Sequence, residues 1–317
     1  MKVVVPTPIA TGMYVAYPTA NGYSNTGDYA AHSMVTAYVV GNRVIVDSLK
    51  SQFECVVNHT GTLPTLTMTT PWVRVGASNA WRPFDSVVSS QSIGYTFGDN
   101  FFDRMTYKLV GVGRITTVCV LATDASFVRV TFSPDGGATL TYNKTIKAVD
   151  TTPVIDAWTY FFADLNVARD FVFDDIDGWG ATSAAEIKIV VSNDYSASAV
   201  AVGEIVVGRA YEIGDCHAGA KMSMNDFSRK ESNAFGDLEL VERAYSFTGT
   251  FELEIPTARR NTIQSLLTKL RATPSVYFPS LDDANDGLIV YGFERSFDIT
   301  YETPERSFAS LEIEGLT

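Results

Sequence analysis

Short apolar runs separated by turn residues dominate the middle of the chain. The runs at 115–122, 126–132 and 186–191 are rich in β-branched residues, and the sequence Ser-Pro-Asp-Gly-Gly at 133–137 supplies a turn. The stretch 200–207 is apolar almost throughout, which is typical of a strand buried on both faces. Strands at this spacing, with turn signals between them, predict a β-sandwich or jelly roll over residues 79–208.

Residues 29–78 show a smaller strand pattern. Residues 38–46 predict a strand, a Gly-Asn turn and a second strand, while 52–57 alternates between polar and apolar and 71–76 predicts one more strand. A module of this size buries little core, so we expect it to depend on aromatic side chains or on a neighbouring domain.

The first 28 residues lack sustained periodicity. They are rich in Pro, Gly, Thr and Asn and carry Tyr14, Tyr17 and Tyr23. We interpret residues 1–28 as an extended arm that packs on another domain or another subunit, because solvent alone does not favour so many tyrosines.

Residues 209–317 combine strands with a helix. Four aliphatic residues recur at i, i+3, i+4 and i+7, the spacing of one helical face: Ile263, Leu266, Leu267 and Leu270. Pro256 favours the start of this helix and Pro274 its end. Strand-like runs surround it at 238–245, 246–255, 276–278, 288–293 and 308–316. We therefore predict an α+β domain of antiparallel strands with one helix, in a chain that is mainly β.

Composition places the chain among folded proteins and excludes several partners. It has 317 residues, with 24 Lys and Arg against 36 Asp and Glu, which gives a net charge of −12. A pI near 4.7 leaves no domain-wide basic field, so we expect no nucleic-acid partner. No apolar run is long enough for a membrane span or a signal peptide, so we expect a chain made in the cytoplasm without membrane insertion.

Catalytic and cofactor motifs are nearly absent. Thr116 stands where the third glycine of a dinucleotide fingerprint starting at Gly111 belongs, and no phosphate-binding loop, HExxH or GxSxG motif occurs. The three cysteines form no CxxC pair, which argues against a disulfide framework and a zinc knuckle. We therefore expect no enzyme, no metal and no cofactor.

Two cysteine–histidine pairs are candidates for thiolate or metal sites. Cys216 and His217 are adjacent, and neighbours on a strand point to opposite faces. Cys55 and His59 lie four residues apart in a stretch that is not helical, so we expect this spacing not to bring them together.

Two acidic clusters allow a functional and a simpler interpretation. Asp174, Asp175 and Asp177 precede Trp179, and a glycosidase needs two carboxyls beside an aromatic platform, but an acidic loop next to a buried Trp explains them as well. Residues 282–286 resemble part of a calcium loop but lack its distal Glu, so an Asp/Asn/Gly turn is an equal interpretation.

Charges of opposite sign separate within residues 209–317. The helix face opposite the apolar stripe carries four bases: Arg259, Arg260, Lys269 and Arg271. The remaining chain after the helix holds nine acidic and two basic residues. These surfaces suit identical neighbours that meet head to tail in a ring, although a solvated helix with ordinary charges is the simpler explanation of the pattern.

Residues 38–44 (Tyr-Val-Val-Gly-Asn-Arg-Val), followed by Phe53, Cys55 and Trp72, resemble small chitin-binding carbohydrate modules. Asn42 replaces the usual Asp of those modules, and Tyr29 stands where a Trp is common. The resemblance implies sugar binding by exposed aromatic rings, for which the candidates are the following: Tyr29, Tyr38, Phe53 and Trp72.

The rest of the chain resembles tail and baseplate proteins of tailed bacteriophages that carry such a module near the N terminus. Five segments carry the resemblance: 77–85, 203–209, 226–231, 270–274 and 311–316. It implies a virion structural protein near the tail tip, similar in role to distal-tail or minor tail proteins. In such proteins a strand-rich domain with one helix builds a ring that continues the tail tube, and residues 209–317 have that composition.

Two hypotheses of different classes follow. The first is a structural tail subunit that forms a ring or trimer with itself and contacts other tail proteins. The second is a virion adhesin that uses residues 29–78 or the sandwich to bind host-surface glycans, with affinity raised by multivalency. A glycan-cleaving enzyme is a third, which requires two carboxyls about 5–10 Å apart beside an aromatic ring.

Overall fold

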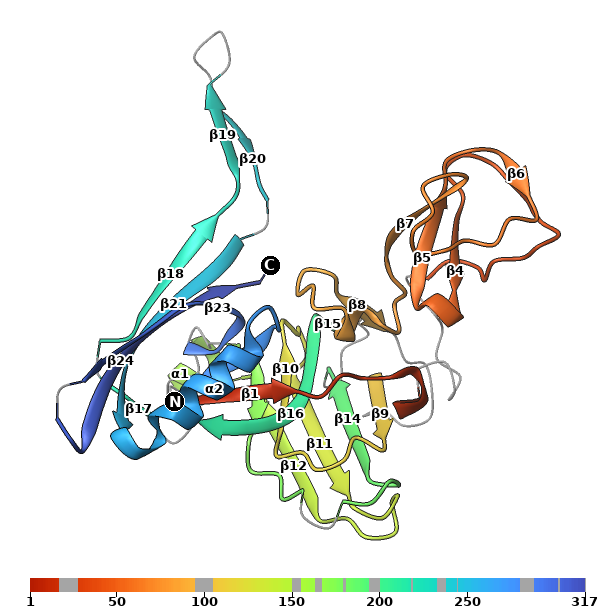
Figure 1. Ribbon diagram of the computed structural model, residues 1–317. Helices are drawn as coiled ribbons and strands as arrows, with labels where there is room; N and C mark the ends of the chain where they lie inside the picture. The colour runs from red at the N-terminus through yellow and green to blue at the C-terminus, as the bar shows by residue number, and fades with distance from the viewer. Residues whose placement is uncertain are drawn as a thin grey trace.

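The computed structural model describes residues 1–16, 28–94, 105–149, 155–162, 167–178, 181–193, 200–217, 219–232, 238–243, 245–279, 288–301 and 303–316. In this part of the chain the protein is mainly β, and its paired strands run antiparallel (Figure 1). The predicted mainly β class is therefore confirmed. No helix among these residues is long and apolar enough to cross a membrane.

A curled ten-stranded sheet is the largest element of the fold. Its order is β13 (Phe171–Phe173), β10 (Thr117–Leu121), β16 (Glu204–Glu212), β1 (Lys2–Pro6), β22 (Ser275–Phe278), β23 (Val290–Tyr301), β24 (Arg306–Gly315), β21 (Tyr245–Pro256) and β17 (Asp215–Cys216), and β18 (Lys221–Asp226) also pairs with β21.

A five-stranded sheet packs against the β13–β10–β16 end of the large sheet. Its order is β12 (Tyr142–Lys147), β11 (Phe127–Ser133), β14 (Glu186–Ser192), β9 (Met105–Val110) and β2 (Tyr14–Ala16). Side chains of both sheets form one buried core, with Tyr107 and Phe132 from the smaller sheet and Val118 and Phe173 from the larger. Two sheets that share a core in this way make a β-sandwich. The predicted strands at 115–122, 126–132 and 186–191 correspond to β10, β11 and β14.

Strand β1 joins the two halves of the large sheet. It pairs with β16 on one side and β22 on the other. Val3 and Val4 are both fully buried, Val3 in the core beneath the C-terminal helix and Val4 in a separate core. Gly208 permits the close approach of β1, because a Cβ there would lie 2.1 Å from the Val5 carbonyl oxygen. The sheet thus runs across the domain boundary that the sequence predicts after residue 208, and residues 2–6 of the predicted arm are a central strand.

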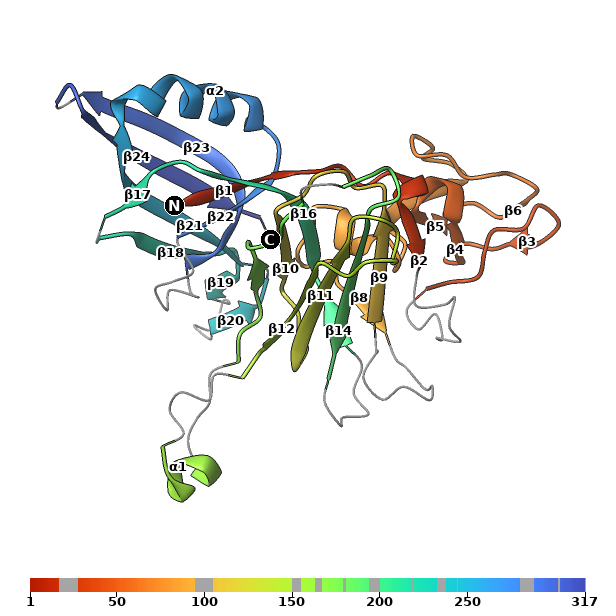
Figure 2. The same ribbon diagram turned by 90° about the horizontal axis from the view of Figure 1, so that it is seen from below.

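Helix α2 (Arg260–Leu270) covers one face of the C-terminal strands (Figure 2). Ile263, Leu267 and Leu270 are buried and pack in one core with residues of β21, β23 and β24. The helix ends four residues before Pro274, as the sequence predicts. The apolar stripe and the antiparallel strands around it are confirmed.

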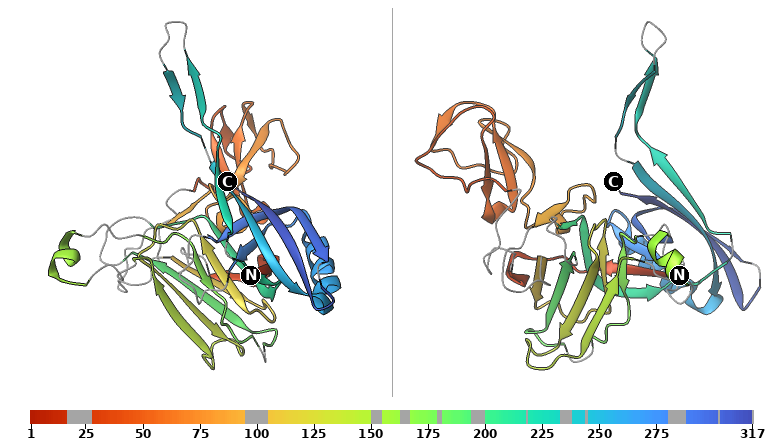
Figure 3. Two further views of the ribbon diagram at one scale, coloured as in Figure 1. Left: turned by 90° about the vertical axis from the view of Figure 1, so that its left-hand side faces the viewer. Right: turned by 180° about the vertical axis from the view of Figure 1, so that it is seen from behind.

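A long hairpin projects from the body (Figures 1 and 3). Strand β18 pairs with the first half of β21, and beyond it β19 (Arg229–Ser232) pairs with β20 (Leu238–Val241). The sequence predicts that 238–245 and 246–255 form a pair of strands, and this pairing is wrong. The two segments are successive parts of one arm of the hairpin, and each pairs with the other arm.

The small N-terminal module stands to one side of the sandwich (Figure 1). Strands β4 (Arg43–Val46), β5 (Ser51–Cys55) and β7 (Trp72–Ala77) form a three-stranded sheet, and β3 (Ala37–Tyr38) pairs with β6 (His59–Thr60). Beside it, β8 (Ser92–Gly94) pairs with β15 (Val200–Val202).

A second helix, α1 (Ala157–Phe162), has no counterpart in the sequence prediction. It stands away from both sheets in Figure 2 and in the left view of Figure 3. Tyr17, Tyr23, Trp179 and the acidic stretch 282–286 lie outside the described residues.

Candidate functional sites

Three of the four rings predicted to bind sugar lie in the core of the small module. Phe53 and Trp72 are fully buried, and Tyr38 is 6% exposed. The Trp72 indole N–H donates to the Thr62 carbonyl at 2.8 Å, and its ring meets the Tyr38 ring edge-on. Stacking on a sugar needs an accessible ring face, so these three side chains are placed to stabilise the module.

Tyr29 is the predicted ring that solvent reaches, with 42% of its surface exposed. The Arg43 guanidinium lies 5.7 Å from the ring centroid and donates to the Tyr29 hydroxyl at 3.2 Å. The same guanidinium donates to the Glu54 carboxylate at 2.8 Å. An aromatic ring beside a cation and a carboxylate offers both a stacking face and hydrogen-bonding groups.

Cys55 and His59 approach each other, contrary to the sequence prediction. The Cys55 Sγ lies 3.6 Å from the His59 Nδ1, because the chain turns between β5 and β6. The His59 Nδ1 also lies 2.8 Å and the Cys55 Sγ 3.2 Å from the Val57 carbonyl oxygen. A carbonyl oxygen can only accept hydrogen bonds, so the Cys55 thiol and the His59 ring both donate to Val57.

Asp174 and Asp175 of the acidic cluster form ion pairs, and His217 of the second cysteine–histidine pair lies beside a carboxylate. Asp174 contacts Lys2 at 2.6 Å, and Asp175 contacts Lys144 at 2.9 Å. His217 Nε2 lies 3.2 Å from the Glu254 carboxylate. Among the described side chains, no group of three His, Cys, Asp or Glu residues is arranged to hold a metal ion.

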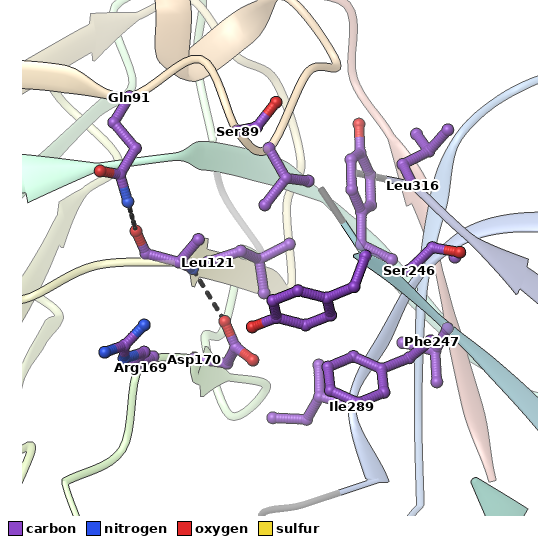
Figure 4. Close-up of a pocket in the computed structure, with 15 residues that line it drawn as sticks. Ser89, Gln91, Leu121, Arg169, Asp170, Ser246, Phe247, Ile289 and Leu316 are labelled. Carbon is purple, nitrogen blue, oxygen red and sulfur yellow. Dashed lines mark hydrogen bonds between the residues drawn. The ribbon is translucent and has the colours of Figure 1, made fainter. Parts of the chain in front are cut away.

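A pocket of about 520 Å³ lies between the sandwich and the C-terminal strands (Figure 4). Leu121 comes from the sandwich side, while Phe247, Ile289 and Leu316 come from the C-terminal side, and Arg169 is exposed at the edge. The walls are therefore mostly apolar with charge at one end.

Asp170 and Gln91 line the same pocket and hold the end of β10. The Ala122 backbone N–H donates to the Asp170 carboxylate at 2.8 Å, and the Gln91 side-chain amide donates to the Ala122 carbonyl at 2.9 Å (Figure 4). Burial raises the pKa of Asp170 above its usual range. These contacts give both side chains a structural role in the pocket wall.

Glu204 is buried where the sandwich meets β23. Its carboxylate accepts the Ser86 backbone N–H at 3.0 Å and lies 3.5 Å from the Tyr291 hydroxyl. Burial raises the pKa of Glu204 to about 9, and the nearby carboxylate of Asp85 adds to the shift. A raised pKa in a carboxyl can mark a catalytic acid, but a buried structural contact produces the same shift. The sequence prediction missed Glu204, because this residue is the single charge in a run at 200–207 that is otherwise apolar.

The projecting hairpin exposes large apolar side chains. Met224 of β18 lies opposite Phe247 of β21, and the two are 59% and 42% exposed. The Tyr245 ring packs edge-on against Phe247. Phe227 and Leu240, farther along the hairpin, are 53% and 63% exposed. The sequence prediction missed this surface, for which the signal was the alternation of methionines in the Lys-Met-Ser-Met run that forms β18.

The basic face of α2 is partly occupied by contacts within the chain. Arg259, next to the helix, reaches Glu212 of β16 at 3.3 Å. Among the ion pairs of the described residues, none involves Lys269 or Arg271. The head-to-tail contact between charged surfaces stays a prediction. Lys269 and Arg271 are the bases that could make it.

Comparison with known proteins gives this chain no family. No protein-family model matches the sequence. No curated protein matches it either.

Proposed function

We propose that this chain is a structural subunit of a bacteriophage tail tip or baseplate. In this proposal it has no catalytic role, joins copies of itself as a ring or a trimer through residues 209–317, and contacts other tail proteins in the virion. The observation that carries the proposal is the projecting hairpin formed by β18 to β21. The resemblance to tail proteins includes residues 226–231, which lie on this hairpin.

The exposed apolar side chains of the hairpin support assembly with a neighbour. A two-stranded ribbon is marginally stable in water on its own, and contiguous exposed apolar surface marks interaction sites in folded proteins. Phe227, Leu240, Val241 and Tyr245 are all more than two-fifths exposed. A neighbouring subunit that covers them removes that surface from water and holds the ribbon in place.

Native mass tests the proposal on the intact chain. Removal of residues 209–317 is a poor test because it deprives β1 of its β22 partner. We instead expect the purified chain to form a defined oligomer in sedimentation experiments and a ring with a central opening, or a trimer, in negative-stain images. Leu240→Asp places a charge on the hairpin, and we expect it to weaken self-association by a factor of about 10–30.

Val75→Asp is the matched control. Val75 is an exposed apolar residue of β7 in the small module, away from the hairpin. The control should keep the wild-type mass. A chain that stays monomeric at every concentration, or an oligomer that Leu240→Asp leaves unchanged, contradicts assembly through the hairpin.

A second candidate function is binding of host-surface glycans, and the surface around Tyr29 favours it. This candidate includes two proposals about the fold: that residues 29–78 form a chitin-binding-like module, and that the sandwich has jelly-roll topology. Tyr29 keeps an exposed ring next to Arg43 and Glu54. On a glycan array, binding that Tyr29→Ala abolishes supports this candidate, whereas a wild-type chain that binds no glycan contradicts it.

A further inference from the structure

A second pocket, of about 370 Å³, lies where the small module meets the body of the protein. Leu49 and Leu66 of the module and Ile9, from the segment after β1, give it apolar walls. Its volume lies within the range of about 300–1,000 Å³ that is usual for ligand sites. Three charged side chains line it as well: Lys50, Arg74 and Asp85. The pocket therefore offers an apolar surface and a charged region to the same ligand.

The Lys50 ammonium lies over an aromatic ring and has no anion beside it. Its Nζ is 3.6 Å from the centroid of the Trp81 ring. It makes no hydrogen bond or ion pair to any of the described residues. Burial lowers the pKa of Lys50, and no neighbouring carboxylate opposes that shift. An ammonium carries three N–H donors, so Lys50 can donate to an acceptor that enters the pocket.

Arg74 adds a second cation with unused donors. Its Nε donates to the Ser51 hydroxyl at 3.0 Å. Its two terminal nitrogens have no hydrogen-bond partner in the part of the chain that the structure describes, and the side chain is exposed. A planar guanidinium matches the geometry of a carboxylate and can donate to both of its oxygens. Lys50 and Arg74 together are thus suited to bind a carboxylate.

Asp85 is the one carboxyl among the described residues that line this pocket. It accepts the Val87 backbone N–H at 2.9 Å and a hydrogen bond from the Ser90 side chain. Burial raises the pKa of Asp85, while the positive charges of Arg74 and Arg82 oppose the rise. The neighbouring Glu204 has a pKa of about 9, so it is neutral at pH 7 and adds no charge. The balance of charge in the pocket therefore favours an anion, and Asp85 keeps capacity to accept further hydrogen bonds.

We propose that this pocket binds an acidic sugar, a pyranose that carries a carboxylate. Lys50 and Arg74 bind the carboxylate, the apolar walls contact the C–H face of the ring, and Asp85 accepts hydrogen bonds from its hydroxyls. A fatty acid or an aromatic acid without hydroxyls offers Asp85 no donor, and a neutral sugar offers the two cations no anion. The inference goes beyond the proposed functions, since it names a site apart from the Tyr29 surface and does not require assembly.

A matched pair of sugars tests the proposal on the full chain. Methyl β-D-glucuronide and methyl β-D-glucoside differ in that a carboxylate replaces a hydroxymethyl group. By isothermal titration calorimetry, we expect wild type to bind the glucuronide at least about tenfold more tightly, and less tightly as salt increases. Lys50→Met and Arg74→Gln should each weaken this binding by a factor of about 10–100. Lys147→Met, at an exposed position of the sandwich, is the matched control and should bind as wild type does.

Tryptophan fluorescence separates binding from a purely structural role of Lys50. A carboxylate that draws the ammonium away from the Trp81 ring should change the emission of wild type but not of Lys50→Met. If Lys50 only joins the module to the body, Lys50→Met lowers the Tm while both variants keep wild-type affinity, which overturns the proposal.

Three further results would also overturn the acidic-sugar site. These are no binding of the glucuronide, equal affinity for the two sugars, and binding that Tyr29→Ala abolishes but Lys50→Met does not. The last result supports the Tyr29 surface as the glycan site. None of them affects the proposed assembly, which is tested by native mass.

Discussion

Two buried carboxyls each support a residue other than glycine in the left-handed region. Ser86 and Ala122 have φ of 63° and 50°, a region that costs L-residues about 1–2 kcal/mol. The Ser86 N–H donates to Glu204, and the Ala122 N–H donates to Asp170. Each acid thus satisfies a backbone donor at a left-handed residue, Ala122 directly after β10 and Ser86 after the helical turn Arg82–Phe84. The sequence does not signal these contacts, because Ser86 and Glu204 are 118 residues apart and Ala122 and Asp170 are 48 residues apart.

The raised pKa of Glu204 predicts a loss of stability with rising pH. The ordinary value is 4.5 and the folded value is about 9, so the folded state binds this proton more tightly than the unfolded state. The stabilisation is complete below pH 4.5 and is lost as pH rises towards 9. Glu204→Gln cannot ionise and keeps an oxygen for the Ser86 N–H, so we expect it to be more stable than wild type at pH 8, by on the order of 5 kcal/mol.

Thermal unfolding at pH 4.5 and pH 8 checks this prediction. Wild type and Glu204→Gln should have similar Tm values at pH 4.5 and separate at pH 8. Glu305→Gln, at an exposed position, is the control and should follow wild type at both pH values. The same Tm difference between Glu204→Gln and wild type at both pH values would contradict a titrating Glu204.

At the scale of elements, α2 was predictable and the hairpin was not. A period of 3.6 residues and two prolines define α2 locally, because burial of one stripe is a property of the helix itself. The alternation of polar and apolar residues within a strand does not show which other strand pairs with it, so the pairing in the hairpin could not be predicted in this way. The short α1 gave no signal of this kind, since Trp158 and Phe162 both face solvent.

Leu267→Ala tests how far α2 stabilises the C-terminal strands. Leu267 is 1% exposed and lies in one core with Phe251 and Leu311. Removal of its side chain should lower the free energy of unfolding by about 2–5 kcal/mol, because a cavity forms under the helix. Chemical denaturation measures the change. Lys269→Ala, on the outer face of the same helix, should cost less than about 0.5 kcal/mol, and equal losses in both variants would contradict the packing described.

For the whole molecule, the sequence predicted the class and several elements but not how they join. The sandwich strands and the C-terminal α+β pattern were readable because each buries a periodic face. The arm at 1–28 gave no hint that residues 2–6 form a central strand, since a buried five-residue strand has too few positions to show a period. The predicted sugar-binding rings illustrate the same limit, because the aromatic pattern of Phe53 and Trp72 did not distinguish a surface from a core.

Val4→Ala tests whether β1 couples the two halves of the large sheet. Val4 packs with Cys119 and Val206 of the sandwich and with Val276 and Phe278 of β22. We expect a loss of about 2 kcal/mol and a fall in amide-exchange protection in both β16 and β22. Protection that falls in only one of the two strands would contradict a shared unit. Val75→Ala, on the small module, should leave both strands protected.

The position of β1 also sets an order of events during synthesis. Its partners lie at residues 208–212 and 276–278, so a chain that emerges from the ribosome carries β1 long before either neighbour exists. Such distant pairing makes loop closure a slow step, and it leaves both edges of β1 open until first β16 and then β22 have been made. Nascent chains halted before β22 should therefore be more prone to intermolecular strand pairing than the finished protein, and a factor that shields open strand edges should raise the yield of native subunits.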